Sequence, residues 1–428
     1  MALVACWISA GLVPLVVMPR EVRAPNDFTP DYVTAVAWAH LGRFGAPLPS
    51  VLAPATADDY AQSVGARRLE SLLGPYYVHP PTALPLVPFR YPVAVAIWQL
   101  ASVALIALLA WLLAPIAAEA SLAIRTPLLF VLLLLWPPML TNLQLGQWSP
   151  LLAVTLAAGH RAWERGARRR GAGWMATATA IKLSPAVLLL PIALSDRRAA
   201  VRFCWVVLAF GLLAFPLGGL AAWQALLRES GGNVVAWRAS WHNVLSVNGL
   251  VARLFRSGSF IGPLGAAPAV GRVLLLAVET ALVGVAALAT VRRQRAEPDR
   301  RRDGCAFALW YVLVVVLNPL AWPHYALLLL LPLALTWRAA VALDVPLSRA
   351  LVAVALLLLS IPKETLFLRA IPLPISPARS LWLSVPLCGA LLLFAAATRL
   401  ALGRDHGRVA VGAGSSGRPS RPQEGRPT

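Results

Sequence analysis

The sequence predicts an all-α, polytopic membrane protein with about 12 membrane segments. Hydrophobic residues make up 59% of the 428 residues and charged residues only 13%, and the mean hydropathy is +0.70. Soluble domains are far less apolar than this. Many windows also approach or exceed the roughly 20 apolar residues that a helix needs to cross a bilayer, and lipid favours helices because it satisfies no backbone polar group.

The arginine-rich runs predict the orientation of the chain. A net charge of +20 would suit a nucleic-acid partner, but the basic residues stand in short runs between apolar segments, at 161–170, at 292–302 and from Arg399 onward. Such runs face the cytoplasm under the positive-inside rule. The loop 20–91 instead carries six basic and six acidic residues. We therefore expect no nucleic acid as partner, and we expect loop 20–91 to be a large first extracytoplasmic loop.

The elements follow from apolar length and charge. Residues 2–19 resemble a signal peptide but lack a basic n-region and an A-x-A cleavage site, so we expect an uncleaved anchor. The integral membrane domain is expected to cover residues 1–400, followed by a disordered, basic cytoplasmic tail at 401–428, which is rich in Gly, Pro, Ser and Arg. Further spans are predicted at 92–114, 126–140, 148–160, 200–221, 265–291, 304–320, 324–341, 347–362 and 379–398.

The stretch "GAGWMATATAIKLSPAVLLLPIALSDRR" predicts a broken-helix hairpin around Lys182. Basic residues flank this apolar stretch on both sides, and a single crossing would put the run at 292–302 outside the cell. Two half-helices that break at "KLSP" return the chain to the cytoplasm. Pro185 favours the break because it cannot donate a helix hydrogen bond.

The cysteines and glycines predict neither a metal site nor a nucleotide site. The four cysteines lie in separate apolar segments without C-x-x-C spacing, so we expect no disulfide and no metal. No GxGxxG or Walker pattern stands between a strand and a helix. We therefore expect no cofactor, and a soluble nucleotide sugar is disfavoured as a donor.

Two carboxylates in "NDFTPDY" follow the first apolar segment. Asp27 and Asp31 flank Pro30, which suits the first turn of a helix that runs to Gly42. One carboxylate is expected to cap this helix, and Asp31 or Thr29 is nearer to its start. Asp27 then has no structural task, so it is the candidate for chemistry.

Other polar groups each have a structural and a functional interpretation. The stretch "YYVHPP" is either an interfacial turn anchored by tyrosines or a substrate-binding element with Tyr77 and His79. In "TNLQLGQWSP", Gln147 and Trp148 form an amide and indole pair that is typical of sugar-facing sites. Lys182 lies near mid-bilayer and either binds an anion or snorkels to the surface. In "NPLAWPHY", His324 is either a surface residue or part of a pocket.

Several short stretches also occur in the order and spacing of a known enzyme family. They are Asp27-Phe28 before a helix ending at Gly42, Tyr77 with Pro80 and Pro81, Gly146-Gln147, Gly173 through "AIKLSP", "HNVLSVNGLVARLF" at 242–255 and "NPLAWPHY" at 318–325. With them the chain resembles glycosyltransferase family 87, the polyprenol-phosphate-mannose-dependent mannosyltransferases of the GT-C superfamily, over about residues 1–400. The resemblance implies a GT-C-type bundle in the plasma membrane.

The resemblance also implies an activity. A sugar, mannose in α-(1,2) linkage, would pass from a polyprenyl-phosphate donor to a glycolipid or polysaccharide acceptor on the extracytoplasmic side. Phosphate leaves without being protonated, so one carboxylate that activates the acceptor hydroxyl suffices. A base opposite the phosphate inverts the anomeric carbon, and a cationic or hydrogen-bonding group must hold the phosphate.

These requirements assign roles to the polar residues. Asp27 is expected to be the general base, with Asp31 as the alternative, and His324 and Lys182 are expected to bind the donor phosphate. The expected substrate-binding residues are Tyr77, His79, Gln147, Asn243, Trp322 and Tyr325.

The chain departs from the family pattern at two places. Asp31-Tyr32 stand where the family has aromatic residues, which leaves both carboxylates open as the base. His79 stands where the family has a tyrosine before the diproline, which leaves the sugar open. The competing function is a polytopic transporter or lipid flippase, which would have internal pseudo-symmetry and short loops. Loop 20–91 favours the enzyme.

Overall fold

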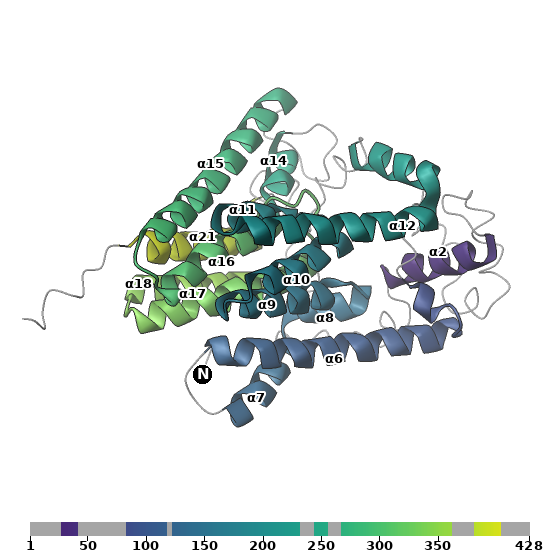
Figure 1. Ribbon diagram of the computed structural model, residues 1–428, viewed down its shortest axis with the longest axis horizontal. Helices are drawn as coiled ribbons and strands as arrows, with labels where there is room; N and C mark the ends of the chain where they lie inside the picture. The colour runs from purple at the N-terminus through teal and green to yellow at the C-terminus, as the bar shows by residue number, and fades with distance from the viewer. Residues whose placement is uncertain are drawn as a thin grey trace, which may run out of the picture.

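The computed structural model describes residues 27–41, 83–117, 122–231, 244–255, 267–361 and 381–403. Over these ranges every regular element is a helix and none is a strand, so the predicted all-α class is confirmed (Figure 1). The predictions for segment 2–19, for Tyr77, His79 and Asn243, and for the tail beyond residue 403 lie outside the described residues.

In the described part of the chain, five helices are long and apolar enough to cross a membrane, or six if one bent pair counts as a single span. The predicted total of about 12 segments is not confirmed, because several predicted spans correspond to helices shorter than the roughly 20 residues that a crossing needs. These shorter helices are α9 (Ser149–Glu164), α16 (Arg300–Val316) and α18 (Pro346–Leu359). The long ones are α6 (Tyr91–Ala117), α12 (Arg197–Gly231), α15 (Pro268–Arg295), η3 with α17 (Pro323–Leu329 and Leu330–Ala342) and α21 (Val385–Leu402).

A sharp bend replaces the single span predicted at 126–140. Helix α7 (Leu122–Leu134) and helix α8 (Pro137–Leu145) meet at an angle of 65°. Trp136 between them has extended backbone angles, and the prolines that open α8 lack the N–H groups that would continue α7. The bend turns α8 into the bundle, where it packs against η3.

The break predicted at "KLSP" is present. Helix α10 (Arg168–Ile181) ends before Lys182, whose φ of −144° and ψ of 133° are extended. The chain resumes as η2 (Ser184–Leu188), with Pro185 in its first turn, and continues as α11 (Leu189–Ser195). Neither half alone reaches the length of a span. Their arrangement as a hairpin returning to the cytoplasm stays a prediction.

Helix α16 forms the centre of the bundle. Its residues from Gly304 to Val316 are buried, and it packs against α15, α17, α21, η2 and η3. Helices α12 and α15 are instead mostly exposed over their apolar windows, with only 11% and 17% of each window buried. Large apolar side chains such as Trp205 and Leu276 point outward from them, so these two helices supply lipid-facing walls.

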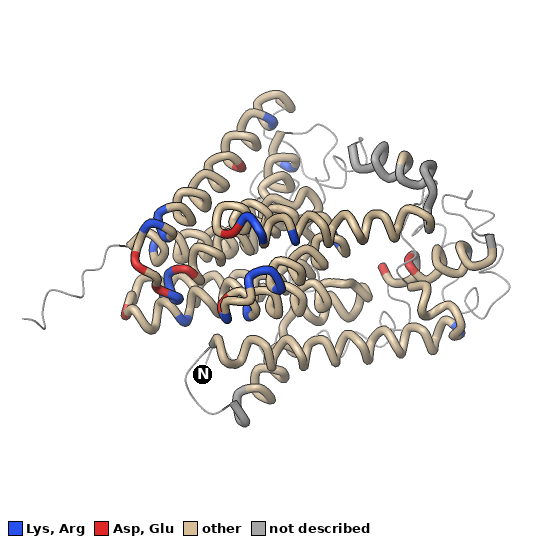
Figure 2. The backbone as a smooth tube through the Cα atoms, in the orientation of Figure 1, with Lys and Arg blue, Asp and Glu red and all other residues tan. Residues whose placement is uncertain are grey.

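Charge is distributed unevenly along the bundle. Figure 2 shows many Lys and Arg residues, together with several acidic ones, toward the end where α15 ends and α16 begins, whereas the acidic residues of α2 (Phe28–Leu41) and its start lie toward the opposite end. Under the positive-inside rule this pattern suits an extracytoplasmic α2. The orientation stays a prediction.

Candidate active site

Helix α2 is fixed to the start of α6 by a small apolar cluster of its own. Phe28 stacks on Trp98 of α6 with ring centroids 5.5 Å apart. The Thr29 and Tyr91 hydroxyl oxygens lie 2.7 Å apart, and the Tyr32 hydroxyl donates to the Phe89 carbonyl at 2.7 Å. These contacts hold the start of α2, and with it the two carboxylates, in a defined place.

The turn between α8 and α9 lies against the start of α2. Gly146 ends α8 with a φ of 69°, a left-handed conformation that favours glycine. Its carbonyl accepts a 3.0 Å hydrogen bond from Trp98 Nε1, and the preceding Leu143 carbonyl accepts one of 2.7 Å from Gln99 Nε2. The backbone N–H of Asp27 donates to the Leu145 carbonyl at 2.9 Å. The turn and the carboxylate are therefore held together through the backbone.

Three of the predicted site residues form one hydrogen-bonded chain. Gln147 Nε2 donates to Asp27 Oδ2 at 2.5 Å, and Lys182 Nζ donates to Gln147 Oε1 at 2.9 Å. The residues are contributed by the start of α2, by the α8–α9 turn and by the break after α10. Residues far apart in the sequence thus bring a carboxylate and an ammonium group onto the two ends of the same side-chain amide.

Asp31 occupies a different position from the one expected. The prediction placed it or Thr29 nearest the helix start, but α2 begins at Phe28, so Asp27 directly precedes the helix and Asp31 lies within its first turn. The Asp31 side chain is buried and Oδ2 accepts a 3.0 Å hydrogen bond from Trp148 Nε1. The two carboxylates are therefore held by consecutive residues of the same turn, and the Asp27 contact leads on to Lys182 through Gln147.

The half-buried Lys182 side chain contacts two other predicted site residues. Its Nζ lies 4.6 Å from the centre of the Tyr325 ring, a cation–π contact, in addition to its hydrogen bond to Gln147. These contacts favour the interpretation as a site residue over snorkelling to the surface. Tyr325 and Gln147, both predicted to bind substrate, thus lie beside the ammonium.

His324 is enclosed in the bundle and not exposed at an outer helix end. Its side chain is 2% exposed, and its ring lies 4.9 Å from that of Tyr325, centre to centre. Among the described residues, neither ring nitrogen has a hydrogen-bond partner. A buried polar group without a partner costs about 1–3 kcal/mol, so this imidazole is a strong candidate for binding a substrate group. Trp322, two residues earlier, is half-buried.

Helix α14 (Val247–Phe255) is anchored next to the segment that leads into η3. The Leu245 N–H donates to the Ala321 carbonyl at 2.6 Å. Arg253 is fully buried and donates to the Val244 carbonyl at 3.1 Å and to Ser384 Oγ at 2.7 Å. Burial lowers the pKa of Arg253 to about 10, so the side chain stays charged at neutral pH. The part of the predicted stretch 242–255 that the structure describes therefore borders the His324 segment.

Several supporting residues were not expected from the sequence. Trp98 and Gln99 sit within an apolar span, and their only sequence signal is a consecutive indole and amide in a segment otherwise suited to lipid. Within the described residues, no group of three or more His, Cys, Asp or Glu side chains is placed to hold a metal ion. The expectation that the site needs no metal stays a prediction.

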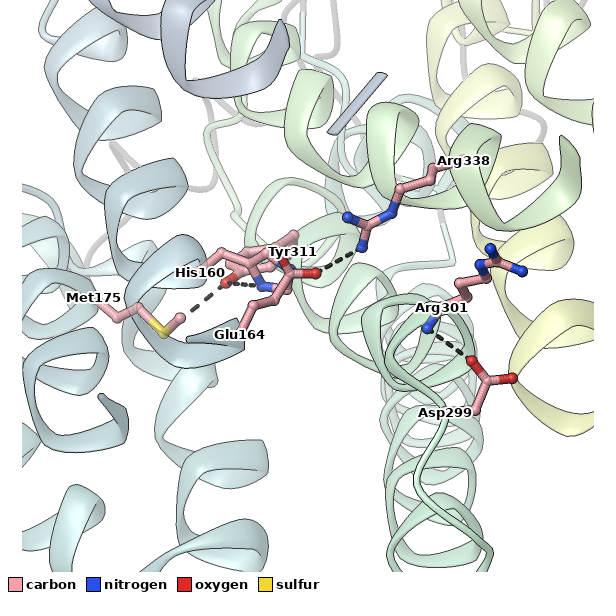
Figure 3. Close-up of polar contacts among 7 residues, drawn as sticks. All are labelled: His160, Glu164, Met175, Asp299, Arg301, Tyr311 and Arg338. Atoms are coloured by element: carbon pink, nitrogen blue, oxygen red, sulfur yellow. Dashed lines mark hydrogen bonds and ion pairs between the residues drawn. The ribbon is translucent and has the colours of Figure 1, made fainter. Parts of the chain in front are cut away.

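A second polar network lies apart from these residues, between α9, α16 and α17 (Figure 3). Arg338 Nη2 lies 2.6 Å from Glu164 Oε1, and His160 Nε2 lies 3.5 Å from the same oxygen. The Tyr311 hydroxyl lies 3.3 Å from His160 Nδ1. Burial alone would raise the pKa of Glu164, but its contacts with His160 and Arg338 outweigh burial and lower the pKa to about 2. We assign this network to stability, because it ties three helices of the core together.

The family comparison covers most of these elements. A model described as glycosyltransferase family 87 matches residues 77–319, which is more than half of the 428-residue chain. Comparison with curated proteins and with solved structures gives no match.

Proposed function

The chain belongs to glycosyltransferase family 87, and from this premise we propose that it transfers mannose, in α-(1,2) linkage, from a polyprenyl-phosphate donor to a glycolipid or polysaccharide acceptor. Family membership makes it a membrane glycosyltransferase, which decides against the transporter and flippase alternatives. The site is proposed to open on the extracytoplasmic face of the plasma membrane, where the donor arrives by lateral diffusion in the bilayer.

The chain of contacts from Asp27 through Gln147 to Lys182 is the observation that supports this proposal best. A glycosyl transfer from a lipid phosphate needs a proton acceptor for the incoming hydroxyl and a positive group for the phosphate. Asp27 and Lys182 are such a pair, and one amide joins them with contacts of 2.5 and 2.9 Å. Lys182 also lies against the ring of Tyr325, which follows His324 in the sequence.

The proposed reaction is a single displacement. The acceptor hydroxyl oxygen attacks the anomeric carbon of the donor sugar while the bond from that carbon to the phosphate oxygen breaks. The hydroxyl proton passes to the Asp27 carboxylate, and the bonding electron pair leaves with polyprenyl phosphate. Attack opposite the phosphate inverts the anomeric centre, by the logic that places a base across from the leaving group in inverting glycosidases.

Lys182 and His324 are proposed to bind the phosphate. The Lys182 ammonium offers three N–H donors and a full charge, and a ring nitrogen of His324 that carries hydrogen can donate to a phosphate oxygen. Such donors stabilise the charge that grows on the phosphate as it departs. No cofactor or metal is part of the proposed reaction.

The remaining predicted residues are proposed to bind the substrates. Tyr325 provides an aromatic ring 4.9 Å from that of His324, and Trp322 precedes His324 by two residues. The sequence alone supports the proposed substrate-binding roles of Tyr77, His79 and Asn243.

One experiment tests the activity as a whole. Membranes from overexpressing and deletion cells are incubated with radiolabelled polyprenyl-phosphate-mannose, and the glycolipid and polysaccharide products are separated. We expect a labelled product that depends on the protein and whose linkage an α-(1,2)-mannosidase cleaves. A protein-dependent product from a different polyprenyl-linked sugar, with none from mannose, would reject mannose as the transferred sugar.

A further inference from the structure

Gln147 joins the two charged groups of the site through opposite ends of one amide. Its Nε2 donates to Asp27 Oδ2 at 2.5 Å, and its Oε1 accepts from Lys182 Nζ at 2.9 Å. An amide has distinct donor and acceptor ends, so these two contacts together fix its orientation. As long as the ammonium occupies the oxygen, the amide NH₂ is directed at the carboxylate.

We propose that Gln147 is a positioning residue that links Lys182 to Asp27 while the donor is absent, and that the donor phosphate breaks this link by taking over Lys182. The inference rests on the proposed function, because it takes a polyprenyl phosphate as the ligand of Lys182. It adds to that function a step in which donor binding frees Asp27, the base, from its contact with Gln147.

The energetics favour such an exchange. The bond from Lys182 to the neutral Gln147 oxygen has a charge on the donor alone. A bond from the same ammonium to a phosphate oxygen has charges of opposite sign on both partners, so the anion competes well for Lys182. Lys182 carries its charge on a flexible four-carbon stem. Its backbone is extended at the break between α10 and η2, so the stem does not have to lie along a helix surface.

The exchange has a consequence for Asp27. Once the phosphate holds the ammonium, Gln147 Oε1 loses its donor, and the amide no longer has to direct its NH₂ at Asp27. The carboxylate can then replace that contact with the hydrogen of the acceptor hydroxyl. The base therefore becomes available when the donor is in place, and donor binding precedes acceptor binding.

A purely structural role for Gln147 is the alternative, and Gln99 provides the matched control. Gln99 is also an amide, and it supports the same α8 segment by donating to the Leu143 carbonyl at 2.7 Å. If Gln147 only supports the turn, its replacement should resemble the replacement of Gln99. If Gln147 competes with the phosphate for Lys182, the charge placed at position 147 should decide whether the affinity for the phosphate rises or falls.

The test measures binding of polyprenyl phosphate, which carries the phosphate but no sugar, to the full-length protein in lipid nanodiscs. Gln147→Glu places a carboxylate beside the ammonium, and the phosphate must compete with an ion pair, so we expect affinity to fall about tenfold or more. Gln147→Leu removes the competing oxygen, so affinity should be unchanged or higher. Lys182→Ala should weaken binding, and Gln99→Leu should leave it unchanged.

Steady-state kinetics with the labelled donor complete the test. Gln147→Leu should not raise the KM for the donor, because it removes the oxygen that competes with the phosphate for Lys182. Equal weakening of polyprenyl phosphate binding by Gln147→Leu and Gln147→Glu would overturn the inference and leave the proposed function intact. If Lys182→Ala binds the lipid as well as wild type does, the phosphate role of Lys182 in the proposed function fails, and the inference fails with it.

Discussion

Gly171 of α10 packs directly on Gly159 of α9, so closely that a Cβ added to Gly171 would lie 2.7 Å from the Gly159 carbonyl oxygen. The same Cβ would lie 3.0 Å from the Trp163 backbone nitrogen. Only a residue without a side chain fits this contact. Gln147 lies two residues before α9 and Lys182 directly follows α10, so the packing of these two helices helps to position both site residues.

Gly171→Ala should therefore weaken both the fold and the site. The added methyl group meets backbone on both sides, and overpacking of this kind costs about 1–3 kcal/mol. We expect a lower midpoint of thermal unfolding and reduced turnover, since α10 must shift and carry Lys182 with it. Gly173→Ala is the matched control in the same helix, because a Cβ there meets nothing within 4 Å. It should be neutral or stabilising by about 0.5–1 kcal/mol, and equal destabilisation by both changes would contradict the packing argument.

Glu164→Gln should destabilise the protein in a way that depends on pH. The folded-state pKa of about 2 lies below the ordinary value of 4.5, so the carboxylate adds stability above about pH 4.5 that is lost as pH falls toward 2. Breaking its contacts with Arg338 and His160 should cost about 1–3 kcal/mol at neutral pH. The difference in thermal unfolding midpoint between variant and wild type should become smaller as the pH of the measurement is lowered.

An exposed ion pair supplies the control for that series. Asp344 lies 2.7 Å from Arg349, but its side chain is 85% exposed. Solvent screens such a pair, so Asp344→Asn should change the unfolding midpoint little at any pH. If the difference in unfolding midpoint between Glu164→Gln and wild type stays constant from neutral to acidic pH, the Glu164 charge does not stabilise the fold.

Local sequence properties were sufficient to predict the fold class and most helix positions. Apolar length located α6, α15 and α21, and Pro185 marked the break after α10, because composition and proline act within a few residues. The bend between α7 and α8 was missed, although Pro137 and Pro138 signal it. Apolar residues continue across the bend, so hydropathy alone reads one span where the backbone makes two helices.

The candidate-site residues stood out in the sequence, but their arrangement in space did not. Asp27, Gln147 and Lys182 were each singled out by a costly or unusual polar position in an apolar chain. The Gln147 amide joins Asp27 to Lys182 because three separate segments of the chain meet in space. Hydropathy and proline patterns within one segment do not show such a meeting. For His324 the sequence left open a surface residue at a span end or part of a pocket; η3 packs against α8 and α9 and buries the side chain.

His324→Ala should lower activity by about 10²-fold, the effect of removing one hydrogen-bond donor from a developing anion. The imidazole is buried, and within the described residues both ring nitrogens are without a partner. Its loss therefore removes no internal hydrogen bond, and expression and folding should persist. His40→Ala, at the exposed end of α2, is the control and should behave like wild type. Normal turnover of His324→Ala at low and saturating donor would remove this residue from phosphate binding.

Asp27→Asn and Asp31→Asn form the decisive pair, because each keeps the size of the side chain and removes the proton acceptor. Gln147 connects Asp27 to the ammonium that we assign to the phosphate, whereas Asp31 is buried and bonded to Trp148. Asp27→Asn should therefore remain folded and lose about 10² to 10⁴-fold in turnover, the range expected for loss of a general base. Asp31→Asn should cost about 1 kcal/mol of stability and retain much of the activity. Product formation and thermal unfolding of both variants in lipid nanodiscs provide the comparison. An inactive Asp31→Asn beside an active Asp27→Asn would exchange the two roles, and full activity in both would exclude a carboxylate base from this pair.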